Sequence, residues 1–193
     1  EGDPLWFDTS PGASEADRWG LEYLFGVSEA SVGGARSTFR PFWAHDRAQE
    51  KQALVEFLAY IRERRTEHPG MHIYHYAPYE RTALVRLAGR HGVGEDEVDA
   101  LLRAGVLVDL YACVRAAVRV GCSSYSLKYL EALYMTSPRT GQVTTASDSI
   151  VEYANACEVR DAGDDAQWQQ RLDQIAEYNR YDCESTLGLR DWL

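Results

Sequence analysis

The order of strand-like and helix-like segments is the feature that most constrains how this chain folds. Two aromatic-rich runs come first, with a turn around Gly33 and Gly34 between them, and strands that alternate with helices follow. The expected strands are residues 21–30, 39–45, 71–76 and 105–109. The expected helices start after Asp46, include 84–88, and cover 95–103, 110–118, 126–134 and about 165–193. This order predicts an α/β fold, a mixed central sheet flanked by helices, although several folds share that outline.

Composition narrows the class of protein. A chain of 193 residues, 45% of them hydrophobic, is able to bury the core of a single domain. No apolar run approaches the roughly 20 residues that span a bilayer, and the acidic start is unlike a signal peptide. We therefore expect a soluble, cytoplasmic protein that does not contact the membrane. The net charge of −10 argues against nonspecific wrapping of nucleic acid, but it is compatible with an acidic pocket that bound metal neutralises.

The cysteines show no spacing that is typical of a zinc site. They are Cys113, Cys122, Cys157 and Cys183. A chain of this size folds without a disulfide, so we expect most of them to be buried free thiols.

The last helix carries the strongest signal for a functional site. Its apolar stripe consists of Trp168, Ile175, Tyr178, Leu189 and Leu193. Asn179 and Asp182 fall on the same stripe. A carboxylate that faces a core is unfavourable unless it is paired, hydrogen-bonded or bound to metal, so Asp182 is either a metal-binding or catalytic acid or a buried salt bridge or cap. Tyr178 lies on the same face four residues earlier, where it either orients a water or packs as a core aromatic.

Other polar residues at element boundaries also have two interpretations. Glu80 lies in the first turn after Pro78, where the helix dipole favours an acid whether or not it binds metal. Asp109 ends a buried strand, and capping of the next helix is the favoured interpretation. His72 and His75 are three residues apart on a strand, so they point to opposite faces and do not readily chelate one ion.

Taken in order, several segments resemble one family. These segments are EGDP, GLEYLFGV, FWAHD, YHYAPYE, VDLY, SYSLKYLE, DSIVEYA and YNRYDC followed by ST and LRDWL. The chain resembles the predicted RecB-like nucleases that carry an RNase H-like domain, relatives of the DnaQ-type DEDD exonucleases. The resemblance extends over nearly the whole chain, and the succession of segments is specific where any one of them is not.

The resemblance implies the positions of three exonuclease motifs. The third is matched by Tyr178 and Asp182, which indicates the tyrosine subtype. The second is usually an aspartate and is matched by Glu80, whose extra methylene changes its reach. The first is Asp-x-Glu followed by Gly-Asp-Pro, which makes Glu1 its glutamate and puts the aspartate two residues earlier. The chain is thus expected to begin inside this motif, as part of a longer protein. A rival first motif at residues 7–10 is disfavoured because it ends in a serine.

The function that the resemblance implies is a divalent-metal-dependent nuclease. It would remove nucleotides from single strands, DNA in the first instance, in the 3′-to-5′ direction. Glu1, Glu80 and Asp182 would hold two Mg²⁺ or Mn²⁺ ions, and Tyr178 would position the attacking water. The full-length protein would commonly include a helicase portion.

Four residues are candidates for contact with nucleic acid. They are His75, Tyr76 and Tyr79, which would stack on or touch the terminal nucleotide, and Lys128, which would touch a phosphate. Core packing for the first three and solvation for the lysine are the structural alternatives.

Two further functions stay open. One is a degenerate module that binds nucleic acid or a protein partner, and the other is a RecB-type endonuclease with a carboxylate–lysine site at Lys128.

Overall fold

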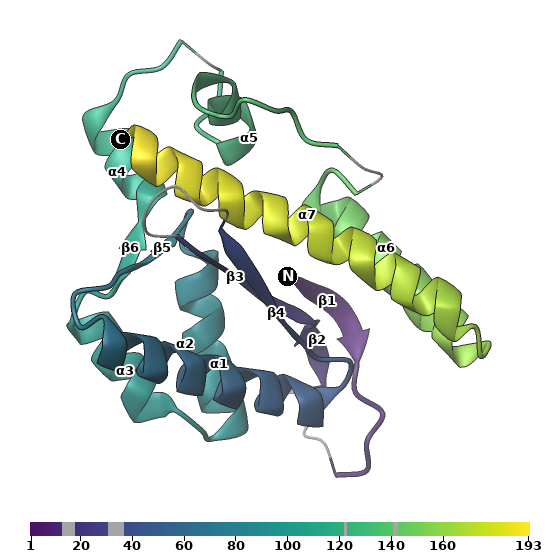
Figure 1. Ribbon diagram of the computed structural model, residues 1–193. Helices are drawn as coiled ribbons and strands as arrows, with labels where there is room; N and C mark the ends of the chain where they lie inside the picture. Colours follow the sequence, from purple (N-terminus) through teal and green to yellow (C-terminus); the bar gives the residue numbers. More distant parts are fainter. Residues whose placement is uncertain (13–17, 31–36, 122, 141–142) are drawn as a thin grey trace. The chain divides into compact units, whose positions relative to one another are not determined.

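The computed structural model describes residues 1–12, 18–30, 37–121, 123–140 and 143–193 (Figure 1). The turn expected around Gly33 and Gly34, and the thiol of Cys122, lie outside these residues. The strands are β1 Gly2–Phe7, β2 Trp19–Glu22, β3 Leu24–Glu29, β4 Thr38–Trp43, β5 Ile73–His75 and β6 Leu107–Asp109. The helices are α1 Arg47–Glu67, α2 Tyr79–His91, α3 Glu95–Arg103, α4 Leu110–Ala117, α5 Leu127–Leu130, the 3-10 helix η2 Glu131–Leu133, α6 Ala146–Asp161 and α7 Asp165–Trp192.

The predicted α/β class is confirmed, because antiparallel strand pairs precede a parallel pair and helices follow both. Among the described residues, β1 pairs with β2 and β3 pairs with β4, both antiparallel, whereas β5 and β6 are parallel. The run expected as one strand at 21–30 is divided into β2 and β3 by the fully buried Tyr23. Beside it, Leu24 pairs with Trp43 and exchanges backbone hydrogen bonds with Glu1, so this run has partners on both sides.

The chain divides into two compact units. Unit 1 comprises residues 1–46 and 137–184, and unit 2 comprises residues 47–136 and 185–193. Helix α7 contributes its longer first part to unit 1 and its last turns to unit 2. The expectation that residues 1–193 form one RNase H-like domain stays a prediction.

The core of unit 1 is an aromatic stack between the strands and the two last helices. Tyr23 and Tyr153 lie face to face with ring centroids 4.0 Å apart, and the Tyr23 hydroxyl is hydrogen-bonded to Ser149 of α6 at 2.8 Å. Trp168 and Ile175 of α7 pack on the same cluster, as the apolar stripe predicted. Burial of these large rings is the main favourable term that holds α6 and α7 on the strands.

His45 joins this stack and carries an unusual pKa. Its Nδ1 lies 3.1 Å from the Tyr153 hydroxyl, and its ring stacks with Trp43 and Tyr153. Burial lowers the pKa of His45 from 6.5 to about 4, and the nearby charge of Arg160 lowers it further in the same direction. The folded state therefore holds this imidazole in its neutral form.

We expect acidification to destabilise the protein through His45. Between pH 6.5 and about 4, His45 is protonated in the unfolded chain but neutral in the folded chain. The free energy of unfolding therefore falls as the pH falls. The free energy of unfolding should decrease between pH 7 and pH 5, and His45→Asn should make this decrease smaller by about 1–2 kcal/mol. Urea unfolding of both proteins at the two pH values measures this difference. Identical pH dependence in the two proteins would contradict the role given to His45.

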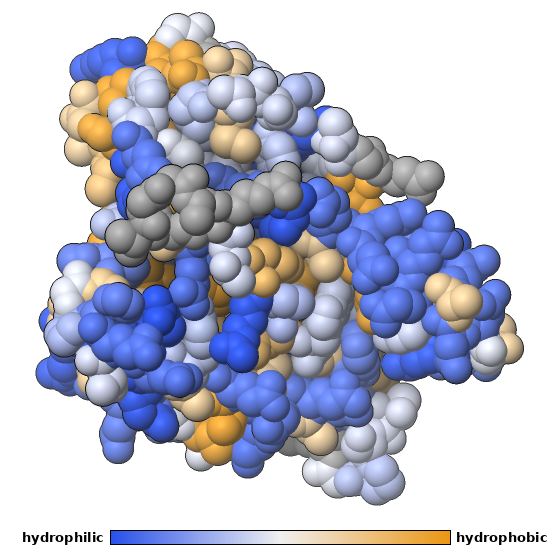
Figure 2. All heavy atoms as spheres, in the orientation of Figure 1, coloured by the Kyte–Doolittle hydropathy of each residue, from blue (hydrophilic) through white to orange (hydrophobic). Residues whose placement is uncertain are grey.

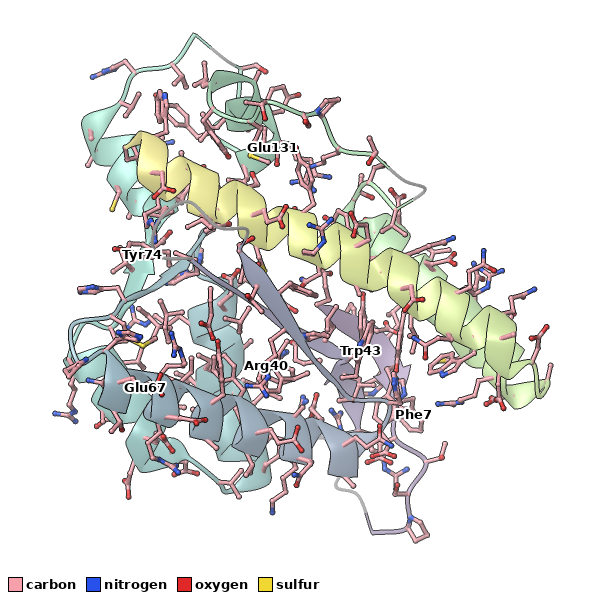
Figure 3. All side chains as sticks on the ribbon, in the orientation of Figure 1. Phe7, Arg40, Trp43, Glu67, Tyr74 and Glu131 are labelled. Carbon is pink, nitrogen blue, oxygen red and sulfur yellow. The ribbon has the colours of Figure 1, made fainter. Side chains whose placement is uncertain are left out.

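Unit 2 packs α1, α2 and α3 against one another and holds a second cluster around the end of α7. Leu110, Val114, Leu130 and Leu189 form that cluster. The predicted cap is confirmed: Asp109 accepts a hydrogen bond from the Tyr111 amide at the start of α4. Beside α7, Glu131 accepts a hydrogen bond from Ser185 at 2.9 Å (Figure 3). Leu193, predicted on the buried stripe, is exposed because it follows the last residue of α7.

The surface is predominantly hydrophilic on the face drawn in Figure 2, where apolar areas are small and separate. Among the described helices, none has both the length and the apolar composition that a membrane crossing requires. Cys113, Cys157 and Cys183 are free thiols, but Cys113 is exposed and the other two are only partly buried. The expected burial of the thiols is therefore wrong for Cys113, which lies on the outer face of the short helix α4.

Candidate functional site

The first and the last predicted acids lie in the same unit. Glu1 sits just before β1, where its backbone bonds to Leu24 in both directions, with the Glu1 nitrogen 2.7 Å from the Leu24 oxygen. Asp182 lies on the part of α7 that belongs to unit 1. Burial raises the pKa of Glu1, and the negative charge of Asp182 raises it further. The two carboxylates therefore share one local electrostatic environment.

Tyr178 completes this group. Its side chain is 7% exposed and is hydrogen-bonded to Asp182, which lies one helical turn later. Burial raises the pKa of Tyr178 well above its usual value, and the charges of Asp182 and Glu1 add to that rise. The phenol consequently stays protonated at neutral pH and acts as a hydrogen-bond donor. The structure thus brings together Glu1, Tyr178 and Asp182.

Asp182 is paired with an arginine that the sequence did not point to. Arg139 places a guanidinium nitrogen 2.5 Å from the Asp182 carboxylate. The same guanidinium lies over the ring of Tyr178 at 5.6 Å and over the ring of Tyr181 at 4.8 Å, measured to the centroids. The salt bridge that the sequence left open for Asp182 is therefore present.

Two more residues of unit 1 shape the environment of Glu1. The buried carboxylate of Glu22 raises the pKa of Glu1, after the larger effects of burial and of Asp182. A hydrogen bond from the Asn179 side chain acts in the opposite sense and stabilises the ionised form of Glu1. The helical stripe already predicted that Asn179 shares a face with Asp182, whereas nothing in the sequence pattern marked Glu22.

Gly26 of β3 leaves the space that Asn179 occupies. A Cβ at this position would overlap the Asn179 carboxamide oxygen and would lie 2.9 Å from the ring of Phe39. We expect Gly26→Ala to displace Asn179 and so to remove the hydrogen bond that favours ionised Glu1. The pKa of Glu1 should rise further, and stability should fall by about 1–3 kcal/mol from overpacking.

Carboxyl carbon NMR titration of Glu1 and chemical unfolding measure these two effects of Gly26→Ala. Gly89→Ala is the matched control, because Gly89 lies inside α2 and a Cβ there meets no atom within 4 Å. In a helix interior this control should be neutral or slightly stabilising. A Glu1 titration that is unchanged in Gly26→Ala would show that Asn179 does not hold this carboxylate.

The donor set suits part of a site for a hard cation. Carboxylate oxygens are the ligands that Mg²⁺ and Mn²⁺ prefer, and Glu1 and Asp182 supply two of them. Within the part of the chain that the structure describes, no group of three or more histidine, cysteine, aspartate or glutamate side chains is arranged to hold an ion. A guanidinium stands at the Asp182 oxygen where a cation would bind. The chemistry fits a cation, and two carboxylates alone leave its coordination incomplete.

Glu80, the predicted second-motif acid, belongs to unit 2. It lies in the first turn of α2, is 49% exposed on its side chain, and approaches His75 Nδ1 to 3.6 Å. Burial lowers the pKa of His75, but the hydrogen bonds to Glu80 and to the Ala77 carbonyl outweigh it, so the net shift is upward. The helix-start position that the sequence indicated is present, and a role in binding metal stays a prediction.

The junction before α2 has a strained backbone. Ala77 has a φ of +67°, a conformation that a residue with a Cβ rarely adopts. Its amide donates to Asp109 at 2.9 Å, so the carboxylate that caps α4 also holds this turn. Strain of this kind persists only where surrounding contacts fix it, and it is common near functional sites.

The candidate nucleic-acid contacts also lie in unit 2. His75 is 5% exposed, and Tyr76 packs edge-on against Tyr111 and bonds to the Tyr125 carbonyl, so both take the packing role in this structure. Tyr79 is 51% exposed, and Lys128 is exposed on the short helix α5. Tyr79 and Lys128 are therefore accessible to a nucleic-acid strand.

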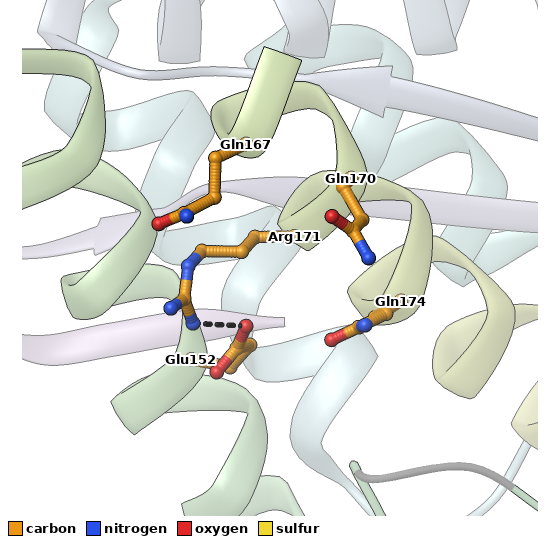
Figure 4. A pocket seen from close by; sticks show the side chains of 5 residues that line it. All are labelled: Glu152, Gln167, Gln170, Arg171 and Gln174. Atoms are coloured by element: carbon orange, nitrogen blue, oxygen red, sulfur yellow. Dashed lines mark hydrogen bonds and ion pairs between the residues drawn. The ribbon is translucent and has the colours of Figure 1, made fainter. Parts of the chain in front are cut away.

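A shallow hollow of about 180 Å³ lies elsewhere in unit 1, between α6 and the first turns of α7 (Figure 4). It is lined by Glu152, Gln167, Gln170, Arg171 and Gln174. Arg171 bonds to Glu152 at 2.6 Å inside it, so its charges are already neutralised. None of the acids discussed above lines this hollow.

Comparison with known proteins decides the family. A family model described as the RNase H superfamily matches residues 13–193. The chain belongs to the RNase H superfamily. No curated protein and no solved structure gives a significant match. Membership in the RNase H superfamily agrees with the mixed strand order and gives the chain a nuclease-type fold, and such nucleases generally use divalent metal ions.

Proposed function

We propose that this RNase H superfamily member is a divalent-metal-dependent nuclease of the DEDD type, tyrosine subtype, related to the RecB-like and DnaQ-type enzymes. It would remove nucleotides from single-stranded nucleic acid in the 3′-to-5′ direction. The observation that carries the proposal is the convergence of Glu1, Tyr178 and Asp182, from the two ends of the sequence, on one local environment. The negative charge of Asp182 raises the pKa of Glu1, so the proximity of the two acids favours a positive group beside Asp182, which Arg139 provides in this structure and a metal ion would provide in the nuclease.

In the proposed mechanism Glu1 and Asp182 would hold the cations through their carboxylate oxygens. Bound divalent cations would activate a water and neutralise charge on the phosphate. Tyr178 would keep its proton in the hydrogen bond to Asp182, because its raised pKa keeps the phenol protonated, and its hydroxyl oxygen would accept a hydrogen bond that orients the attacking water. Glu80 is the further metal ligand that the resemblance implies. The exposed Tyr79 and Lys128 would contact the nucleic-acid strand, and His75 and Tyr76 remain proposed contacts to its terminal nucleotide.

Cleavage of labelled strands tests the proposal. The protein is incubated with 5′-labelled single-stranded DNA or RNA and Mn²⁺, with EDTA as the control. We expect a ladder that shortens from the 3′ end, absent with EDTA and slowed in Tyr178→Phe. No degradation of either strand with Mn²⁺ or Mg²⁺ would contradict the proposal.

A noncatalytic module is a second candidate function, and the Arg139–Asp182 salt bridge favours it, because that pair neutralises Asp182 without metal. Such a module would shift a labelled strand on a gel and leave it intact. A carboxylate–lysine endonuclease would instead lose cleavage in Lys128→Ala and be indifferent to Tyr178→Phe. For each of these functions, a helicase portion of a longer protein is the proposed partner.

A further inference from the structure

Arg139 is held against α7 by contacts that surround its guanidinium. The Tyr181 hydroxyl donates to the Ser137 carbonyl at 2.9 Å, which ties the segment just before Arg139 to the helix. The Arg139 side chain is 13% exposed and that of Asp182 28%, so the ion pair between them is largely removed from water. An arginine buried in this way has a defined position rather than a range of solvated conformations.

The position of the guanidinium conflicts with the binding of a cation. At 2.5 Å, the Arg139 nitrogen occupies the space next to the same Asp182 oxygen that a metal ion would need. Two positive groups also repel each other strongly where water is scarce. Arg139 therefore opposes metal binding at that oxygen, and movement of the guanidinium away from Asp182 would favour it.

The tyrosine rings offer the guanidinium a place after such a movement. The ring of Tyr181 is the nearer of the two, with its centroid 4.8 Å from the guanidinium carbon, against 5.6 Å for Tyr178. An aromatic face attracts a guanidinium without help from a carboxylate. Arg139 can thus release Asp182 and keep a favourable contact.

We propose that Arg139 is a built-in counter-ion that neutralises Asp182 in the metal-free protein and competes with the divalent cation for it. Arg139 is thereby a positioning residue that sets how tightly the site takes its metal. The inference rests on the proposed function, because the cation is the one that the nuclease would use. The inference concerns the affinity of the site for its metal ion, whereas the proposed function concerns the cleavage of the strand.

Mn²⁺ binding to the full chain, measured by calorimetry and by the electron paramagnetic resonance of free Mn²⁺, tests the inference. Removing the competing charge in Arg139→Gln should lower the Kd for Mn²⁺ about tenfold. Arg139→Lys keeps the charge but loses the planar contact with the rings, so its Kd should fall less. Arg171→Gln is the matched control, since it breaks another ion pair of unit 1, with Glu152, away from the acids.

Thermal unfolding adds a readout that does not depend on cleavage. Without metal, Arg139→Gln should melt at a lower temperature than the parent, because Asp182 loses its partner beside Glu1. Saturating Mn²⁺ should raise the melting temperature of Arg139→Gln more than that of the parent. An arginine that only supports the fold would lower both melting temperatures equally and leave the Kd unchanged or raised.

The outcomes separate the inference from the proposed function. If Asp182→Asn abolishes Mn²⁺ binding while Arg139→Gln leaves the Kd unchanged, the inference is overturned and the nuclease proposal stands. If neither the parent nor Arg139→Gln binds Mn²⁺, the proposed function fails and the inference fails with it. Should Arg139→Gln not fold, a Kd in Arg139→Lys equal to that of the parent overturns the inference.

Discussion

Asp182→Asn is expected to lower the rate of strand degradation by more than about 100-fold, the upper loss typical of residues that only support a metal ligand. Asparagine keeps the shape of the side chain but removes the charge that the cation and Arg139 both need. Its carboxamide oxygen still accepts the hydrogen bond from Tyr178. The single-turnover rate with Mn²⁺ on a 5′-labelled single strand measures the effect.

Asp173→Asn provides the control for Asp182→Asn. Asp173 lies on the same helix, is exposed, and accepts a hydrogen bond from Gln169 at 2.9 Å. The same chemical change there should leave the cleavage rate within about twofold, because surface substitutions change little. Circular dichroism of both variants checks that α7 remains folded. If Asp182→Asn cleaves as fast as Asp173→Asn, Asp182 does not hold the metal.

The sequence predicted most elements because their signals are local. Apolar spacing located α1, α2 and α7, a short acidic run indicated α3, and α4 was predicted to follow directly on the strand that ends at its cap, Asp109. Helix α6 was not predicted, although Thr145 and Asp148 form a capping box at its start. Its apolar residues do not make a clear stripe, and an aspartate replaces the usual glutamate or glutamine. The expected helix at 126–134 is a short helix, α5, followed by the 3-10 helix η2.

The site was predictable only where residues share a helix or a motif. Tyr178, Asn179 and Asp182 fall on one face of α7 by helical spacing alone, and Glu1 came from the resemblance. Glu22 reaches the site through the pairing of β2 with β1. Arg139, which precedes α6 in the chain, reaches it through its ion pair with Asp182. Such contacts depend on the assembled unit and have no periodic signal. This is also why the Asp182 salt bridge could be proposed while its partner could not.

Glu50→Ala is expected to lower the free energy of unfolding by about 3–5 kcal/mol, because it removes a buried carboxylate from the ion pairs that it forms with largely buried cationic side chains. Glu50 of α1 is fully buried. Its carboxylate lies 2.9 Å from Arg47, 3.2 Å from Arg90 and 2.8 Å from His91. The side chains of Arg90 and His91 are only 10% and 8% exposed, so water cannot replace the lost carboxylate easily.

Glu97→Ala is the control for Glu50→Ala, and chemical unfolding compares the loss of stability in the two variants. The Glu97 carboxylate lies 2.7 Å from Arg62, but the arginine is 66% exposed, so the pair is solvated. Its loss should change stability by only about 0–1 kcal/mol, although the two pairs have similar lengths. A larger loss of stability in Glu50→Ala than in Glu97→Ala would then reflect the burial of the Glu50 ion pairs. Equal losses would mean that water reaches Arg90 and His91, and that the Glu50 cluster does not join α1 to α2.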